Sequence, residues 1–291
     1  MHTSLYGILA AINWAVADIF IAQSTKSIRP IIAAAVVNLL GAMSFGVYYL
    51  VFMKHEVPSN LIGIVWSALA GIFIISASIV FFIALSKGPI AIVSALSSTY
   101  PAVTLILALA AFGAKIDTIQ AFGFFMVLTG VVATAGLHSN GTGHVVGKTS
   151  GTLPALMAAF FWGIGYGLLG EGVNLIGWEA ASAIQFGVLA VCCLIILCIL
   201  ALKDSENLTS IKASARNPFI LGAAATQQLG AILLNIGIGG DNTGGSIIVA
   251  LSACYPVLTT IMAFYLFKER IRTAALFAGA LAIAGIVVLS V

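Results

Sequence analysis

The sequence contains very little charge. Only 7% of its 291 residues are Asp, Glu, Lys or Arg, whereas a typical soluble domain carries about 25%. Hydrophobic residues make up 61% of the chain, and the mean hydropathy is +1.16. So few charged side chains cannot cover a surface that faces water. The composition therefore predicts an integral membrane protein and excludes a soluble enzyme or binding module.

Features of nucleic-acid-binding and redox proteins are also missing. The formal net charge is only +3 and no basic run exceeds two residues, which argues against a nucleic-acid partner. The four cysteines lie in apolar runs without C-x-x-C spacing, at Cys192, Cys193, Cys198 and Cys254. We interpret them as small buried hydrophobic residues, and they leave the redox compartment open.

The chain lacks the groups that an intramembrane enzyme needs. The histidines all fall in predicted loops or near the start of the chain, at His2, His55, His138 and His144. No Ser-His or paired-carboxylate arrangement occurs within an apolar run. Gly147-Lys148-Thr149 matches the end of a phosphate-binding loop, but Thr142 stands where that motif requires glycine. We therefore expect no catalytic residue, no cofactor and no metal site.

Apolar runs of membrane-spanning length, in contrast, are abundant. Breaks at glycine, proline and charged residues divide the chain into ten segments. The segments are 4–24, 30–53, 61–86, 89–113, 117–137, 152–170, 178–202, 217–238, 243–267 and 273–291. No basic stretch precedes the first segment, so we expect it to remain as a span and not to be cleaved as a signal peptide.

One stretch of the sequence occurs twice. Residues 95–132 and 250–287, aligned without a gap, are identical at 14 of 38 positions. Both copies carry Ala-Leu-Ser-x-x-Tyr-Pro inside an apolar run, with the prolines at Pro101 and Pro256. Proline removes a helix hydrogen bond, so both helices are expected to kink or break there. A tolerated bend is one interpretation; the other is a gate or hinge, because interrupted helices in two repeats are typical of transporter binding sites.

The chain divides into two similar halves. The longest polar stretch, 138–151, is interpreted as a flexible linker between repeats 1–137 and 152–291. An odd number of spans per repeat forces the second copy to enter the membrane upside down. The expected fold class is therefore an all-α integral membrane protein with ten transmembrane helices in two inverted five-helix repeats.

The first spans of the two halves also correspond. Leu5…Ala10-Ala11…Trp14 aligns with Leu153…Ala158-Ala159…Trp162. Together with the repeated Ala-Leu-Ser-x-x-Tyr-Pro and the later Lys268-Glu269-Arg270, these residues resemble the EamA family of the drug/metabolite transporter superfamily. The resemblance covers nearly the whole chain. It implies ten helices around a central cavity that opens alternately to the two sides without ATP, and it names no single substrate. The family's Glu-Arg pair is Glu269-Arg270, which has Ala114-Lys115 as its counterpart in the first half.

Lys and Arg are distributed unequally between the predicted loops. In the ten-span arrangement, all of them except Lys54 and Lys115 fall on one side. The positive-inside rule predicts that this side is cytoplasmic and that both termini lie outside. The family resemblance implies cytoplasmic termini, so the two arguments give opposite orientations.

Asp18 is the one acidic residue placed well inside a predicted span. A carboxylate at the bilayer centre costs about 2.5–3.5 kcal/mol on insertion scales, so it is expected to face a cavity or a partner. In that position it would be the proton-coupling group. The alternative is an acid near the helix end that reaches the lipid headgroups.

Aromatic residues are predicted to surround Asp18. Trp14 lies four residues before Asp18 on the same helical face, and Trp162 and Tyr166 repeat this spacing. The predicted substrate-binding set is Trp14, Asp18, Tyr100, Trp162, Tyr166, Gln227, Gln228 and Tyr255. Such rings can hold amines and quaternary ammonium groups by cation–π attraction, or they can simply pack.

The leading hypothesis is a secondary active transporter that moves a small organic metabolite by alternating access, with proton coupling through Asp18. One alternative is a carrier specific for an organic cation held in an aromatic cage; another is a membrane scaffold without transport. The expected partners are the substrate and the lipid bilayer of the cell (inner) membrane, for a monomer or homodimer.

Overall fold

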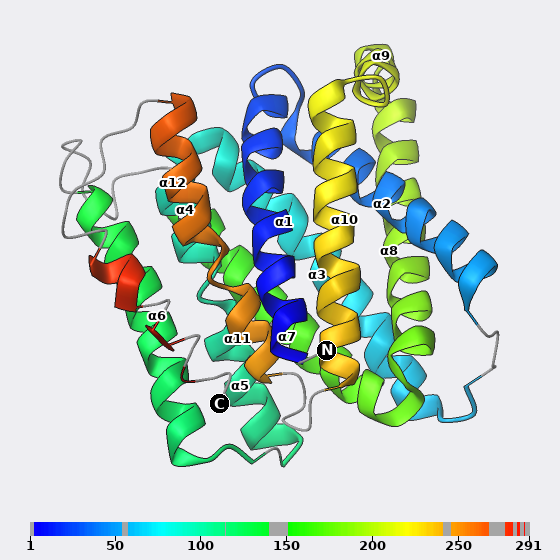
Figure 1. Cartoon of the computed structure of the whole chain (residues 1–291). Coiled ribbons are helices and arrows are strands. Elements are labelled where there is room, and N and C mark those ends of the chain that lie inside the picture. The colour runs from blue at the N-terminus through cyan, green and yellow to red at the C-terminus, as the bar shows by residue number, and fades with distance from the viewer. Residues whose placement is uncertain are drawn as a thin grey trace.

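The computed structural model describes residues 3–53, 58–113, 115–139, 151–240, 246–267, 277–281, 284–285 and 288. Its main elements are all helices (Figure 1). They are α1 (Thr3–Ser24), α2 (Pro30–Phe52), α3 (Leu61–Lys87), α4 (Ile90–Ser97), α5 (Tyr100–Ala111), α6 (Thr118–Ser139), α7 (Thr152–Ile176), α8 (Trp178–Lys203), α9 (Ser205–Ser214), α10 (Pro218–Gly239), α11 (Ser246–Ser252) and α12 (Tyr255–Phe267). The all-helical expectation is confirmed.

Within the described residues, seven stretches are long and apolar enough to cross a membrane. They are α1, α2, α3, α4 together with α5, α7, α8 and α10. Shorter apolar helices lie within α6 and across α11 and α12, at Thr118–Ala133 and Ile247–Met262. Most of the predicted tenth segment, 273–291, lies outside the described residues, as do Glu269-Arg270 and nearly all of the linker.

Local sequence signals set the helix ends. The side chains of Asn60 and Asn217 accept hydrogen bonds from the first turns of α3 and α10, at Gly63 N (3.1 Å) and Phe219 N (2.9 Å). A single residue, Gly177, joins α7 to α8 with φ of 78°, a left-handed conformation that a side chain would strain. This tight junction aligns α7 and α8 as antiparallel neighbours.

Some boundaries differ from those predicted. The segment expected to end at Gly170 continues to Ile176, because α7 packs closely against α3 along this length. Helix α6 extends two residues into the predicted linker, to Ser139. Helix α9 was not expected; its signal is Asp204, whose side chain caps it by accepting a hydrogen bond from Glu206 N at 3.0 Å.

Two spans are interrupted where the repeated motif predicts it. Helices α4 and α5 are separated at Ser98-Thr99, and α11 and α12 at Ala253-Cys254. Pro101 and Pro256 lie in the first turn of the helix that follows, where the missing N–H costs no helix hydrogen bond. The predicted breaks are therefore confirmed.

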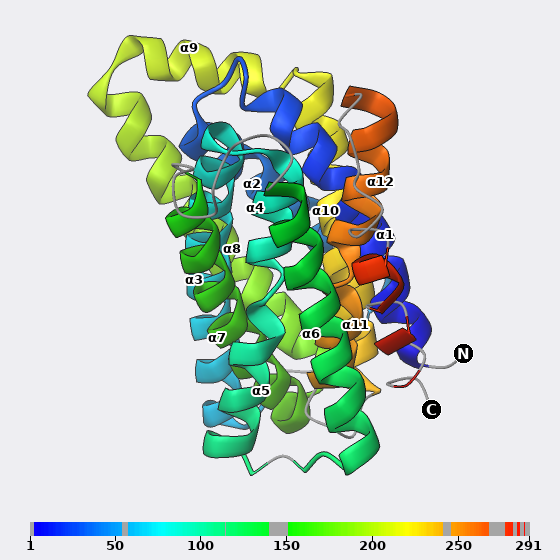
Figure 2. The same ribbon diagram turned by 90° about the vertical axis from the view of Figure 1, so that its left-hand side faces the viewer.

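The two halves of the chain interlock (Figures 1 and 2). Helix α1 packs against α10, and α7 packs against α3. The α3–α7 pair is antiparallel, because Gly63 faces Ile176 at one end of α3 and Gly151 faces Gly88 at the other. The α1–α10 pair is antiparallel too, because Phe20 of α1 lies against Gly222 and the earlier Trp14 against Gly230. Helix α2 packs against α8. Each half thus uses its first helix to hold the third long helix of the other half.

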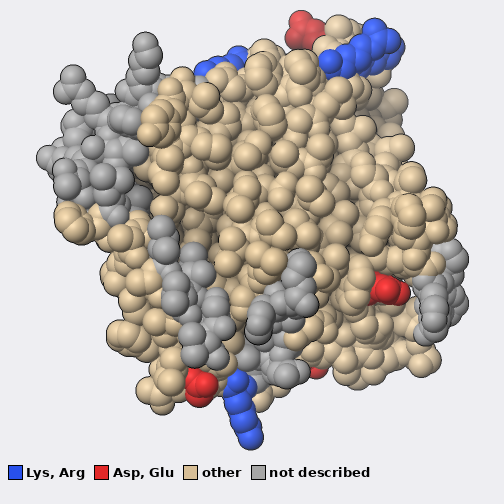
Figure 3. Space-filling model, viewed as in Figure 1, with Lys and Arg blue, Asp and Glu red and all other residues tan. Residues whose placement is uncertain are grey.

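Charged residues gather at the two ends of the bundle (Figure 3). At the end that carries α9 lie the α1–α2 turn, the end of α3 and the α8–α10 segment, with Lys26, Arg29, Lys87, Lys203, Lys212 and Arg216. Arg29 donates to Asn207 Oδ1 of α9 at 2.7 Å. Lys115 lies at the opposite end, between α5 and α6. The band between the ends is mostly uncharged, as a lipid-facing surface should be.

Candidate functional site

The predicted site residues meet at one cavity inside the bundle. All eight residues of the predicted substrate-binding set contribute to its lining. The cavity has a volume of about 50 Å³, which is room for a few water molecules. Its walls come from both halves of the chain, with Trp14 and Tyr100 from the first and Trp162 and Tyr255 from the second. The sequence therefore identified residues that lie together although they are distant in the chain.

Asp18 is deep in this interior and only 3% exposed. Its Oδ2 accepts hydrogen bonds from Ser94 Oγ of α4 and, at 3.4 Å, from Thr259 Oγ1 of α12. Each of the two interrupted spans thus contributes one hydroxyl to the same carboxyl oxygen. The alternative in which Asp18 reaches the headgroups is wrong, because its side chain turns inward to these hydroxyls.

Trp14 is the centre of a group of aromatic rings. Its ring centroid lies 6.1 Å from those of Tyr166 and Tyr255 and 6.5 Å from that of Tyr100. Tyr100 in turn lies 6.1 Å from Trp162. Several of these contacts are edge-on, a favoured packing geometry for aromatic pairs. The rings thus pack on one another and do not enclose an open box.

The indole of Trp14 is fixed by α10. Its Nε1 donates to the backbone oxygen of Gln227 at 3.2 Å. Gly230, one turn further along α10, lies against the same indole, and a Cβ there would come within 2.6 Å of Nε1. The missing side chain at Gly230 therefore lets α1 and α10 approach closely enough for the hydrogen bond.

The two Ser-x-x-Tyr motifs bond to each other reciprocally. Ser97 Oγ and Tyr255 OH are 2.9 Å apart, and Tyr100 OH and Ser252 Oγ are 2.8 Å apart. Tyr255 OH also donates to Ser94 O at 3.2 Å. The serine of each half therefore pairs with the tyrosine of the other, immediately beside the two helix breaks. We call these two pairs the crossed Ser–Tyr pairs.

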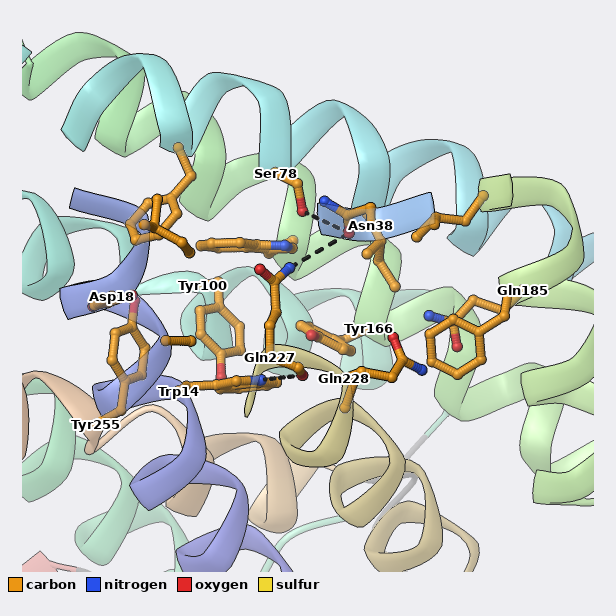
Figure 4. A pocket seen from close by; sticks show the side chains of 18 residues that line it. Trp14, Asp18, Asn38, Ser78, Tyr100, Tyr166, Gln185, Gln227, Gln228 and Tyr255 are labelled. Carbon is orange, nitrogen blue, oxygen red and sulfur yellow. Dashed lines mark hydrogen bonds between the residues drawn. The ribbon is translucent and has the colours of Figure 1, made fainter. Parts of the chain in front are cut away.

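Amide side chains form the remaining polar part of the cavity (Figure 4). Gln227 Nε2 donates to Asn38 Oδ1 at 3.4 Å, and Ser78 Oγ donates to the same oxygen at 3.5 Å. Gln185 accepts a hydrogen bond from Asn235 Nδ2 at 3.0 Å. Asn38, Ser78 and Gln185 line the cavity but were not predicted as site residues. Spans that are apolar on every side have no amphipathic pattern to show which polar side chains face inward.

Metal-ligating side chains do not cluster in the described ranges. No group of three or more His, Cys, Asp or Glu residues there is placed to hold a metal ion. The chemistry of the cavity is therefore that of one carboxyl group, several hydroxyls and amides, and aromatic rings.

Comparison with known proteins decides the family. A model of the EamA-like transporter family matches residues 2–136 and again residues 149–291. The chain belongs to the EamA-like transporter family. This EamA-family protein is therefore a multi-pass integral membrane protein. The family model matches the chain twice, which indicates that its two halves arose by duplication.

Two relatives extend over nearly the full length of the chain. A protein of Archaeoglobus fulgidus described as an uncharacterized transporter is 27% identical over 276 residues, covering 92% of this chain and 90% of its own. A protein of known crystal structure matches with a TM-score of 0.68 at 18% identity, covering 98% of this chain and 95% of its own. The second likeness shows a shared fold.

Proposed function

We propose that this EamA-family protein is a secondary active carrier that moves a small organic metabolite by alternating access, with the cavity beside Asp18 as its substrate site. One observation carries the proposal. Residues from both halves converge on one partly open cavity, and its lining includes the one buried carboxyl group described within the spans. A membrane scaffold would have no need of such a group, because burying it costs stability without benefit to packing.

The proposal includes ten transmembrane helices in two inverted repeats, 1–137 and 152–291. The reciprocal contacts between the halves support it. Helix α1 packs on α10 as α7 packs on α3, and Ser97 bonds to Tyr255 as Ser252 bonds to Tyr100. An exchange of equivalent contacts is what a twofold axis between two copies produces.

The crossed Ser–Tyr pairs and the breaks beside them are the proposed moving parts. A hydroxyl pair contributes only about 0.5–1.5 kcal/mol, so it can break and re-form during each transport cycle. Pro101 and Pro256 keep the interrupted spans from closing into continuous helices. Rocking of the halves would then separate Ser97 from Tyr255 and Ser252 from Tyr100 and would open the cavity.

Asp18 is the proposed coupling group. A proton and a positively charged or hydrogen-bond-donating group of the substrate would occupy its carboxyl in turn. Ser94 and Thr259 would hold the carboxyl in place during this exchange. Ser94 belongs to the interrupted span of the first half and Thr259 to that of the second. Binding of a proton or of substrate at Asp18 would therefore depend on how the two halves are arranged.

The experiment is transport by the purified chain in proteoliposomes, with a ligand found by a thermal-shift screen of amines, amino acids and sugars. We expect Asp18→Asn to abolish accumulation driven by a pH gradient and to retain exchange of labelled for unlabelled substrate. Asp117→Asn, at an exposed turn, is the control and should accumulate normally. Accumulation that survives Asp18→Asn would remove Asp18 from the coupling step. Absence of any flux of a bound ligand would favour the scaffold.

The aromatic-cage alternative receives less support. A cage for a quaternary ammonium group needs several ring faces around an open space. Here Trp14 meets Tyr100 and Tyr255 edge-on, at interplanar angles of 70° and 88°, and these contacts fill the space between the rings. We therefore assign the rings to packing and to shaping the cavity.

A further inference from the structure

A second cavity lies at the end of the bundle opposite α9. Its volume is about 490 Å³, and it lies between the end of α2, the start of α3 and the α7–α8 junction. Ser59 and Gly177 in its lining are exposed, and Asn60 and Glu179 add further polar groups. We call this cavity the vestibule. It is large enough to admit a hydrated solute, whereas the central cavity of about 50 Å³ holds only a few water molecules.

One buried ring stands between the vestibule and the central cavity. Phe45 of α2 is 1% exposed and lines neither of them. Its ring centroid lies 4.6 Å from that of Phe186, which lines the central cavity. It lies 6.1 Å from that of Tyr49, which lines the vestibule, and these two rings are stacked. We call Phe186, Phe45 and Tyr49 the ring column.

The ring column follows the length of the bundle. Trp178 at the start of α8 lines the vestibule, and Phe186 comes eight residues later, about 12 Å along the helix axis. On the antiparallel side, Tyr49 lies one turn beyond Phe45 toward the end of α2. The three rings therefore lead from the interior of the bundle to its end, as a route across the membrane must.

The ring column can open without breaking side-chain hydrogen bonds of its two phenylalanines. At the other end of the central cavity, Asp18 is held by the hydroxyls of Ser94 and Thr259. Phe45 and Phe186 have no polar side-chain atoms, so separating them leaves no buried donor or acceptor unpaired. The vestibule provides the space into which Phe45 can turn.

A glycine follows each of the two phenylalanines. A Cβ at Gly46 or at Gly187 would meet nothing within 4 Å, so neither glycine is needed for close packing. Glycine within a helix is less stable than alanine, because its backbone is more flexible. Helices α2 and α8 are therefore least rigid directly beside the rings that they place in the column.

We infer that the ring column is the gate between the central cavity and the end of the bundle opposite α9. Bending at Gly46 and Gly187 separates Phe45 from Phe186, and solute then passes between α2 and α8 through the vestibule. This inference rests on the proposed function, because a carrier needs a closure on each side of its site. It adds the route on one side and the residues that close it.

The test measures how fast Ala231→Cys reacts with a membrane-impermeant thiol reagent, in a chain whose four native cysteines are replaced. The reagent is applied to each face of oriented vesicles, and Ser59→Cys identifies the vestibule face. Phe45→Ala and Phe186→Ala should each speed the reaction from that face about tenfold, because each removes one ring of the closure. The rate from the opposite face should not change.

A paired glycine variant predicts the opposite effect. Gly46→Ala combined with Gly187→Ala should slow the reaction from the vestibule face about fivefold without lowering the melting temperature, because alanine stiffens both helices. Ser44→Ala, exposed on α2, is its control and should leave the rate unchanged. Phe73→Ala is the control for the phenylalanines, because Phe73 packs on Phe161 outside both cavities.

The glycine variant keeps the test decisive if a phenylalanine variant fails to fold. Rates in folded phenylalanine variants that equal the wild-type rate, or that rise equally from both faces, would overturn the inference. An unchanged rate in the folded glycine variant would also overturn it. The labelling needs no substrate, so these results would leave standing any proton-driven transport that depends on Asp18. Absence of that transport in the wild-type chain would count against the proposed function instead.

Discussion

At the scale of single residues, Trp14 links the parts of the site. Its ring contacts three tyrosines from both halves, and its indole N–H bonds to α10. Its predicted counterpart, Trp162, packs on Phe81 with ring centroids 4.9 Å apart and also faces the cavity. Both tryptophans therefore shape the space into which the substrate is proposed to bind.

Replacing Trp14 or Trp162 by alanine should weaken binding of the ligand found in the thermal-shift screen about tenfold, because each substitution removes a wall of the cavity. Isothermal calorimetry on purified Trp14→Ala and Trp162→Ala would measure this. Trp66→Ala is the matched control, because Trp66 packs on Phe112 away from the cavity. Unchanged affinity in both cavity variants would show that these rings serve packing alone.

The sequence located part of the cavity lining and missed the rest. Spacing and the internal repeat were enough to bring Trp14, Asp18 and Tyr166 to one place. Asn38 and Gln185 were missed because a polar residue on a wholly apolar span looks the same whether it faces a cavity or bonds a neighbouring helix. Only the packing of the other helices decides between these cases.

At the scale of helices, the crossed Ser–Tyr pairs hold the two interrupted spans together. Tyr255 makes two hydrogen bonds through its hydroxyl, and Tyr100 makes one. The repeat made both breaks predictable, since proline at equivalent positions restricts the backbone of both spans in the same way. The pairing itself could not be predicted, because it depends on how the halves meet.

Removing one hydroxyl should favour conformations in which the pairs are broken. We expect Tyr100→Phe and Tyr255→Phe each to increase the rate at which a cysteine placed at Ala231, in the cavity wall, reacts with a thiol reagent. A bond of about 1 kcal/mol corresponds to roughly a fivefold change. Tyr6→Phe, outside the cavity, is the control. Equal rates in all three variants would contradict a gating role.

Helix α7 depends on glycine for its fit between α3 and α5. A Cβ at Gly163 would collide with Val103 and with the backbone oxygen of Tyr100, whereas nothing lies within 4 Å of one at Gly187 on α8. Gly163→Ala should therefore lower the melting temperature. Gly187→Ala should leave it unchanged or raise it, because alanine favours a helix by up to about 1 kcal/mol. Equal shifts in the two variants would argue against close packing of α7.

At the scale of the whole molecule, the described Lys and Arg residues concentrate at the end that carries α9, and Lys115 alone represents them at the other. The positive-inside rule predicts that the α9 end is cytoplasmic. This orientation agrees with the expectation from the charge distribution in the sequence and stays a prediction.

Helix α9 itself was missed by the sequence analysis because it is short and polar, and its composition thus resembles that of a loop.

Alternating access is the central claim, and two-sided labelling of the cavity tests it most directly. The measurement uses Ala231→Cys in a chain whose four native cysteines are replaced, with a membrane-impermeant thiol reagent applied to either face of oriented vesicles. Ala10→Cys, at a fully buried helix contact, is the control. The account predicts that residue 231 reacts from both faces and that a bound substrate slows the reaction. Reaction from one face only under all conditions, or from neither face, would contradict it.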